Sequence, residues 1–321
     1  MVLWPQIVAA LDARVELHQR GSLLLAHRGD ENAALRVVQL LQRKAPPDDA
    51  PQRLDAAGLR ELEPAVQGCA HSWLLPREGQ IHCVQAMAAL AGAAGARSVR
   101  WHWGTRITHV TPGRLHQEQR SWAFDHVFDV RGTGSRPSAA GAGSWPLAPL
   151  VPLAPPMLLP GGDADFISNV RPEDQGFTPQ VRGVRGEIIW LHAPGVTLRR
   201  PVRLLHPRHR VYLVPRQGDM IVVGASEIES EDRSPVSLRS TVELLAAAHS
   251  VLPELAEARV VHTETNLRPA LPDNLPRLEQ SEGLTRINGL FRHGWLIAPA
   301  LVEQALARLA PVAHRHEEPV A

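Results

Sequence analysis

The spacing of apolar and polar positions predicts a chain in which helices and strands are mixed. Helical repeats of apolar residues, with proline or glycine boundaries, predict helices at 4–17, 30–42, 58–66, 79–96, 234–249 and 299–309. Short apolar runs predict strands at 21–26, 99–102, 107–110, 126–130, 186–192, 211–214, 220–224, 259–265 and 284–289. A glycine-containing turn between 211–214 and 220–224 predicts a hairpin. Since strands and helices do not alternate regularly, we expect an α/β or α+β fold with more than one sheet.

Some segments carry more specific expectations. In the helix at 79–96, Val84, Met87, Ala88 and Ala91 recur at i, i+3, i+4 and i+7, which predicts an inward face of small and apolar residues. The segment 267–276 reads as irregular because prolines interrupt it.

The residues from 135 to 180 differ in character from the rest of the chain. They are rich in Pro, Ala and Gly and lack periodic apolar positions. We interpret this segment as an insertion outside the regular elements.

Composition narrows the classes of protein to consider. The 321 residues are 44% hydrophobic and 21% charged, with a formal net charge of +1, as in ordinary globular proteins. The arginines are scattered among acids, so we expect neither a nucleic-acid partner nor a membrane-binding surface. Two cysteines, Cys69 and Cys83, form no CxxC pattern, and a reducing cytoplasm is the expected location.

Membrane spans and metal sites are not expected either. The most apolar stretch, 147–160, is broken by four prolines and cannot form a spanning helix. His206 and His209, and the pair His314 and His316, have no carboxylate or thiolate at ligand spacing on a predicted element.

The segment Ile287–Leu301 is the most informative one for chemistry. A strand leads through Arg292, His293 and Gly294 to a helix in which Pro299 is expected at the first turn. The N-terminus of a helix presents unpaired backbone N–H groups and a positive dipole end, which stabilise negative charge. The alternative reading is an ordinary loop-to-helix junction.

Two arginines and one tyrosine are candidates for binding an anionic substrate. Arg268 and Arg292 each lie beside a proline or glycine corner, and a guanidinium grips a carboxylate through two parallel hydrogen bonds. The alternative for each arginine is a solvated surface charge. Tyr212 is the only tyrosine and lies in an apolar strand. Its hydroxyl could bond a substrate or simply a backbone carbonyl.

Four segments in order give the chain a family resemblance. They are VRGVRGEIIW (181–190), VYLVPRQGDMIVVGASE (211–227), NLRPALPDNLPR (266–277) and INGLFRHGWLIAPAL (287–301). Through them the chain resembles the FAD-dependent D-amino-acid oxidase family, and within it the glycine oxidases of thiamine biosynthesis. The resemblance implies an FAD domain of Rossmann type interwoven with a mixed-sheet substrate domain.

The resemblance also implies site residues and a reaction. Catalytic positions fall on Tyr212, Arg268 and Arg292, with Arg268 as the carboxylate clamp. Cofactor-binding positions fall on Ile107, Arg131, Gly132, Gly294, Trp295, Leu296 and Ile297. The implied reaction oxidises a small, glycine-like amino acid to the imine, with hydride transfer to flavin N5 and peroxide formation from dioxygen. The oligomeric state is left open, and a homo-oligomer is one possibility.

The chain departs from the family at the FAD pyrophosphate site. Gly132 and Gly134, and Gly141 and Gly143, begin GxG patterns, but no GxGxxG occurs. We therefore expect an incomplete FAD domain, and an inactive family remnant or a related secondary-amine or D-amino-acid dehydrogenase are the alternatives. The expected division is a substrate domain at 1–66 and 181–267, a partial FAD-binding domain at 67–134 and 268–321, and the insertion at 135–180.

Overall fold

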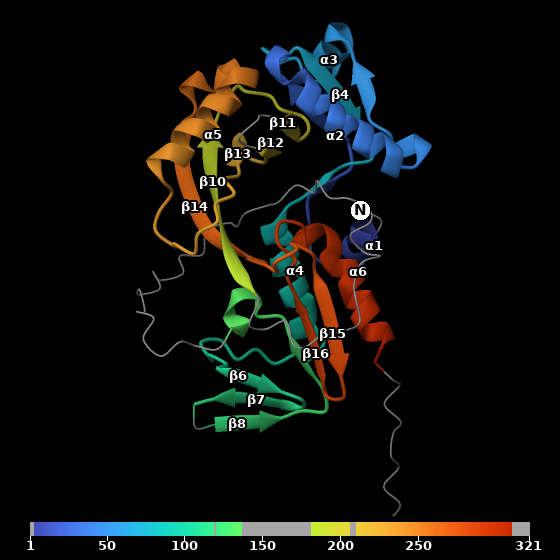
Figure 1. Ribbon diagram of the computed structural model, residues 1–321, viewed down its shortest axis with the longest axis vertical. Helices are drawn as coiled ribbons and strands as arrows, with labels where there is room; N and C mark the ends of the chain where they lie inside the picture. Colours follow the sequence, from blue (N-terminus) through green and yellow to red (C-terminus); the bar gives the residue numbers. More distant parts are fainter. Residues whose placement is uncertain (1–2, 119, 137–180, 206–209, 310–321) are drawn as a thin grey trace, which may run out of the picture.

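An eight-stranded sheet is the largest element of the fold (Figure 1). The computed structural model describes residues 3–118, 120–136, 181–205 and 210–309. The strand order is β14 (Arg259–Ala270), β10 (Arg182–His192), β13 (Met220–Gly224), β12 (Arg210–Arg216), β11 (Val202–Leu205), β2 (Ser22–Ala26), β4 (His71–Leu75) and β3 (Gln52–Leu54). Neighbouring strands are antiparallel except β11 and β2, which are parallel.

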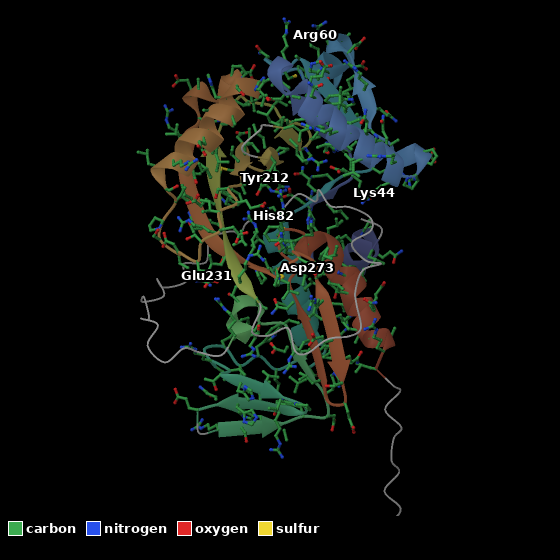
Figure 2. All side chains as sticks on the ribbon, viewed as in Figure 1. Lys44, Arg60, His82, Tyr212, Glu231 and Asp273 are labelled. Atoms are coloured by element: carbon green, nitrogen blue, oxygen red, sulfur yellow. The ribbon has the colours of Figure 1, made fainter. Side chains whose placement is uncertain are left out.

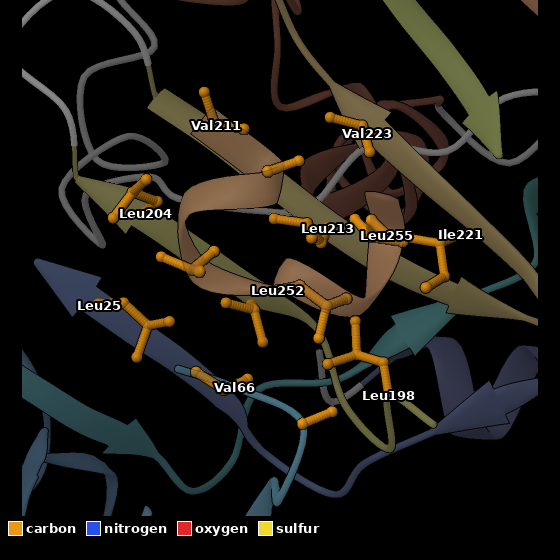
Figure 3. Packing of buried hydrophobic residues seen from close by; sticks show 14 of the residues in the cluster. Leu25, Val66, Leu198, Leu204, Val211, Leu213, Ile221, Val223, Leu252 and Leu255 are labelled. Carbon is orange, nitrogen blue, oxygen red and sulfur yellow. The ribbon is translucent and has the colours of Figure 1, made fainter. Parts of the chain in front are cut away.

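Both faces of this sheet are covered, which explains the continuous apolar run in β10. Ile189 and Leu191 pack in a cluster with helix α5 (Leu238–Val251) on one face (Figure 3). Ile188 and Trp190 alternate with them and pack in a second cluster on the other face. That second cluster also contains residues of α1 (Leu3–Ala9), α4 (Cys83–Ala96) and α6 (Gly294–Ala307). This second face carries the candidate site.

A smaller sheet lies beside the first. Its strands are β15 (Arg277–Ser281), β16 (Leu284–Asn288) and β9 (Val127–Asp129), with β16 and β9 parallel. Leu278 and Ile287 of this sheet pack against Ile297 and Leu301 of α6. The chain passes from β16 into α6 through a short loop, so the small sheet fixes where that helix begins.

The remaining elements complete the fold. A short pair joins β1 (Leu17–His18) to β5 (Gln80–Ile81), and a meander is formed by β6 (His109–Thr111), β7 (Arg114–Gln117) and β8 (Arg120–Ala123). Helices α2 (Glu31–Lys44) and α3 (Ala56–Leu62) accompany β2, β3 and β4 at one end of the molecule (Figure 1). The 3₁₀ helix η3 (Gly132–Ser135) follows β9.

The small sheet leaves an apolar surface uncovered in the described part of the chain. Strand β9 has a neighbour on one side only, and Phe128 and Val130 are exposed beside it. In α4 the buried residues are Cys83, Ala86 and Ala89, whereas Met87 and Ala88 are exposed. The predicted inward face of this helix is therefore wrong. Because α4 is apolar on every side, its apolar spacing does not single out the buried face.

Several predicted elements are confirmed, and others end or begin elsewhere. The hairpin of β12 and β13 and the helix α2 are confirmed, whereas α5 begins at Leu238, four residues later than predicted, and ends at Val251. The first helix ends at Ala9 and does not reach residue 17. Residues 17–18 instead form a short strand that pairs with residues 80–81. Residues 99–102 form no strand; instead Trp101 stacks on Trp103, with ring centroids 5.1 Å apart. The predicted insertion at 135–180 lies almost wholly outside the described residues, as do His206, His209, His314 and His316.

Prolines misled the prediction at two places. Strand β14 continues to Ala270 through Pro269, where an irregular segment was expected. Strand β14 is an edge strand and pairs with β10 on one side only. The missing N–H of Pro269 therefore removes no hydrogen bond to a second neighbouring strand. Helix α6 begins at Gly294, so Pro299 lies inside the helix and not at its first turn. The expected domain division stays a prediction. The large sheet pairs β3 with β4, which lie on opposite sides of the expected boundary between residues 66 and 67.

Pro299 leaves one backbone carbonyl of α6 without a hydrogen-bond donor from the helix itself. A side chain of α1 supplies that donor. In an α-helix the N–H of residue 299 would donate to the carbonyl of Trp295, and proline has no N–H. The indole Nε1 of the buried Trp4 donates to that carbonyl instead, and the two indole rings lie 5.3 Å apart. This bond holds α1 against the first turns of α6.

Replacing Trp4 by Phe is expected to lower the free energy of unfolding by about 1–3 kcal/mol, because it removes the donor to a buried carbonyl. Urea denaturation would measure the change. In a Pro299→Ala background the helix can supply its own N–H, so the same substitution should cost less. Equal costs in both backgrounds would contradict this role of Trp4.

Candidate functional site

Tyr212 and Arg268 lie on the same face of the large sheet, each over a glycine. Tyr212 pairs with Gly224 across β12 and β13, and a Cβ atom at Gly224 would lie 2.6 Å from the tyrosine hydroxyl. A Cβ atom at Gly186 would overlap the guanidinium of Arg268. The two glycines therefore let both side chains lie close to the sheet. Figure 2 labels Tyr212 near the middle of the molecule.

Arg268 is held by backbone carbonyls. Its Nη1 donates to the carbonyl of Ser226 at 3.0 Å and to that of Arg185 at 3.4 Å. Burial lowers the pKa of Arg268, while the negative charges of Tyr212, when ionised, and of Glu227 act in the opposite direction. An arginine keeps its charge under such a shift, so Arg268 is a fixed, largely buried cation.

Arg292 reaches the same region from the other sheet. Burial raises the pKa of Tyr212 to about 12, and the positive charges of Arg268 and Arg292 both oppose that rise. The three side chains thus lie within electrostatic reach of one another. The backbone supports this arrangement, because the N–H of Phe291 donates to the carbonyl of Pro269 at 3.0 Å. The structure brings the three predicted catalytic residues together, and their roles stay predictions.

Two residues that the sequence analysis did not select complete the cluster. Glu227 Oε2 accepts from Arg292 Nη1 at 2.6 Å. Its neighbour Ser226 supplies the carbonyl that accepts from Arg268. One dipeptide after β13 therefore contacts both candidate arginines. The signal was present in the quoted segment 211–227, where a carboxylate follows the strand end, but spacing alone could not show which cation it meets.

A buried ion pair fixes the segment that carries this dipeptide. Glu187 is fully buried and accepts from Arg185 Nη2 at 2.7 Å and from Ser226 Oγ at 2.8 Å. The N–H of Ser237 donates to the same carboxylate at 3.0 Å. Burial alone would raise the pKa of Glu187, but these hydrogen bonds, with one from Ser240, lower it below its usual value. Glu187 is thus an ionised anchor beneath the site.

Three predicted cofactor-binding residues converge beside Pro269. Arg131 Nη1 donates to the carbonyl of Ile107 at 3.2 Å, and its Nε donates to Asp129 at 2.9 Å. Gly132 has a positive φ of 58°, and a Cβ atom there would lie 3.3 Å from Pro269. The backbone of Arg131 is bonded within the protein as well, because its N–H donates to Asp129 Oδ1 at 3.3 Å and its carbonyl accepts from the N–H of Gly134 at 3.0 Å.

The other four predicted cofactor-binding residues form the first turn of α6. Gly294, Trp295, Leu296 and Ile297 lie in the helix, not in a loop before it. The N–H groups of Leu296 and Ile297 donate to the carbonyl of His293, at 2.9 and 3.0 Å. Those of Gly294 and Trp295 come before the helical ladder and carry its positive end. Asn288 links this junction to Gly132, because its Nδ2 donates to the Gly132 carbonyl at 3.0 Å.

Replacing Gly186 by Ala is expected to separate ligand binding from stability. The new Cβ displaces the guanidinium of Arg268, so affinity for a small carboxylate should fall by roughly tenfold or more. The free energy of unfolding should change by about 1–2 kcal/mol, because the displaced atoms end a flexible side chain. Calorimetry with glycolate and urea denaturation measure the two effects. Gly29→Ala is the control, since nothing lies within 4 Å of its Cβ position.

Within the described ranges, no group of three or more His, Cys, Asp or Glu side chains could hold a metal ion. Among the same residues, no helix combines the length and the hydropathy that a membrane span requires.

The fold and this arginine-bearing face define a mixed α/β protein with a cationic site on one face of its large sheet. The structure superposes on glycine oxidase from Geobacillus kaustophilus with a TM-score of 0.71 and 21% identity, covering 97% of this chain and 77% of that one. This confirms the predicted fold class. A family model described as FAD dependent oxidoreductase matches residues 1–308, and the chain belongs to that family.

Curated relatives agree with the family. A Rhizobium etli protein whose name proposes a thiamine biosynthesis oxidoreductase, ThiO, is 50% identical over 134 residues, which cover 42% of this chain and 41% of the relative. The Geobacillus kaustophilus glycine oxidase is 25% identical over 246 residues, covering 74% of this chain and 56% of that protein. These matches span about half the length of the curated relatives.

Proposed function

We propose that this chain carries the flavin-ring and substrate side of an FAD-dependent oxidase of small amino acids, with glycine as the leading substrate. The cluster of Arg268, Arg292 and Tyr212 on one sheet face, beside the start of α6, is the observation that carries the proposal. The glycine oxidases among its relatives support the choice of substrate.

Each residue of the cluster has a role in the proposed reaction. The guanidinium of Arg268 binds the substrate carboxylate, and carbonyls of Ser226 and Arg185 fix its orientation. Tyr212, with a pKa of about 12, stays protonated and donates a hydrogen bond to the same carboxylate. The N–H groups in the first turn of α6 would stabilise the negative charge that develops on a bound flavin ring. None of these groups has to remove a proton from the carbon that is oxidised, because that carbon gives up its hydrogen as hydride.

The described residues fit one half of FAD. The backbone at Gly132, whose carbonyl accepts from Asn288, and the start of α6 could hold the ring system. FAD would supply the hydride acceptor and pass the electrons to dioxygen, with peroxide as product. In the described ranges, no strand followed by a glycine-rich turn and a helix offers a cradle for the pyrophosphate.

Flavin titration of the full chain tests the proposal. We expect FAD to bind, with quenching of its fluorescence, and glycine then to yield hydrogen peroxide. A chain that stays colourless with excess FAD, and that forms no peroxide, would refute the oxidase. The second candidate is an inactive family remnant, which the single-sided strand β9 favours. Such a remnant would keep the substrate-domain fold, or part of it, without binding FAD, and would form no peroxide.

A further inference from the structure

Glu227 places a negative charge among the cations of the proposed substrate site. Its carboxylate bonds Arg292 at 2.6 Å, and the adjoining Ser226 carbonyl bonds Arg268 at 3.0 Å. The side chain of Glu227 is 47% exposed and that of Arg292 is 25% exposed. The pair therefore lies at the open side of the cluster, while Arg268 lies deeper.

The balance of charge decides which anions suit this cluster. The guanidinium groups of Arg268 and Arg292 and the carboxylate of Glu227 sum to a single positive charge, which matches a ligand with one carboxylate. The buried Arg216 also acts on Tyr212, and the carboxylate of Glu16 opposes its charge, so this second pair leaves the balance unchanged. A ligand with two carboxylates would bring its second one to Arg292, where Glu227 already accepts a hydrogen bond. Two carboxylates competing for one guanidinium repel each other, and the repulsion is screened only partly at a half-exposed position.

We propose that Glu227 is a specificity-determining residue that restricts the site to monocarboxylate ligands by occupying Arg292 and repelling a second carboxylate. This inference rests on the proposed function, because it takes Arg268 as the clamp for the first carboxylate. It deepens that function by defining the excluded substrates as amino and imino dicarboxylates.

The sequence around Glu227 provides a matched control. Glu229 lies two residues further on and pairs with Arg182, at 3.0 Å, away from the cluster. Glu227→Gln and Glu229→Gln remove the same charge from the same segment. Only the first removes a carboxylate partner of Arg292.

Binding of glycolate and malonate to the full chain by calorimetry tests the inference without any flavin. In the unchanged chain we expect glycolate to bind more tightly than malonate. Glu227→Gln should raise the affinity for malonate by about tenfold and that for glycolate by about twofold or less. Glu229→Gln should change neither. Adding Arg292→Gln to Glu227→Gln should abolish the gain for malonate.

The outcomes separate the inference from the proposed function. If glycolate binds and needs Arg268, but Glu227→Gln leaves the ratio of the two affinities unchanged, the specificity role is refuted and the proposed function stands. An equal gain for both ligands refutes it as well, since it shows a general charge effect. If neither ligand binds any variant that thermal unfolding shows to be folded, both proposals are contradicted.

Discussion

Replacing Glu187 by Ala is expected to lower the free energy of unfolding by about 3–5 kcal/mol. The substitution removes the nearer carboxylate partner of the Arg185 guanidinium, which is only 4% exposed, and leaves Asp232, whose carboxylate lies 3.3 Å away and is 58% exposed, so the buried charge is compensated only in part. It also removes the acceptor for Ser226 Oγ and for the N–H of Ser237. Urea denaturation followed by circular dichroism measures the loss.

A solvent-exposed ion pair provides the comparison. Glu257 is 91% exposed and lies 3.8 Å from Arg259, so Glu257→Ala should cost less than about 0.5 kcal/mol. A similar cost for both substitutions would show that burial does not set the energy of the Glu187 pair.

The pH dependence of stability has a definite sign at Glu187. Hydrogen bonds hold its folded-state pKa below the usual glutamate value, so its contribution is fully present above that value, about 4.3. The contribution is lost as the pH falls through the lower, folded-state pKa. The Glu187→Ala variant should therefore lose less stability below about pH 4 than the unchanged chain does.

The second large effect is expected at Arg268. Replacing it by Met should weaken glycolate binding by about 100-fold, or about 2.7 kcal/mol, because the ligand carboxylate loses both charge-assisted hydrogen bonds. Arg268→Lys keeps the charge without the planar fork and should cost about tenfold. Calorimetry on the full chain measures both.

Arg182 serves as the control for Arg268. It lies on β10 and pairs with Glu229, so Arg182→Met should leave glycolate affinity within about twofold. Unchanged affinity in Arg268→Met would exclude this residue as the carboxylate clamp.

Local patterns predicted the elements whose ends carry clear signals. The glycine-containing turn at residues 217–218 identified the β12–β13 hairpin. The start of α5 was predicted at residue 234, but the helix begins after Ser237, whose hydroxyl caps it by accepting from the N–H of Ser240 at 3.1 Å. Prediction was less successful where tertiary contacts override local preference. Pro299 stands inside α6 because Trp4, 295 positions away from it in the chain, satisfies the carbonyl that the proline leaves.

The candidate site was only partly predictable for a related reason. Arg268 and Arg292 were selected by residue type and by resemblance, and both come to one place. Glu227 and Glu187 were not selected, because a carboxylate in a sequence does not reveal whether it faces solvent or a cation. The partner of Glu227, Arg292, follows it by 65 positions. Glu187 pairs with Arg185 on its own strand, but its other partner Ser226 follows it by 39 positions.

The one-sided strand β9 has a consequence for the life of this polypeptide in a cell. Exposed backbone at a sheet edge, with Phe128 and Val130 beside it, is the kind of surface that chaperones recognise and that associates with other extended chains. We therefore expect this edge to be the part of the polypeptide on which quality control acts while it stays bare.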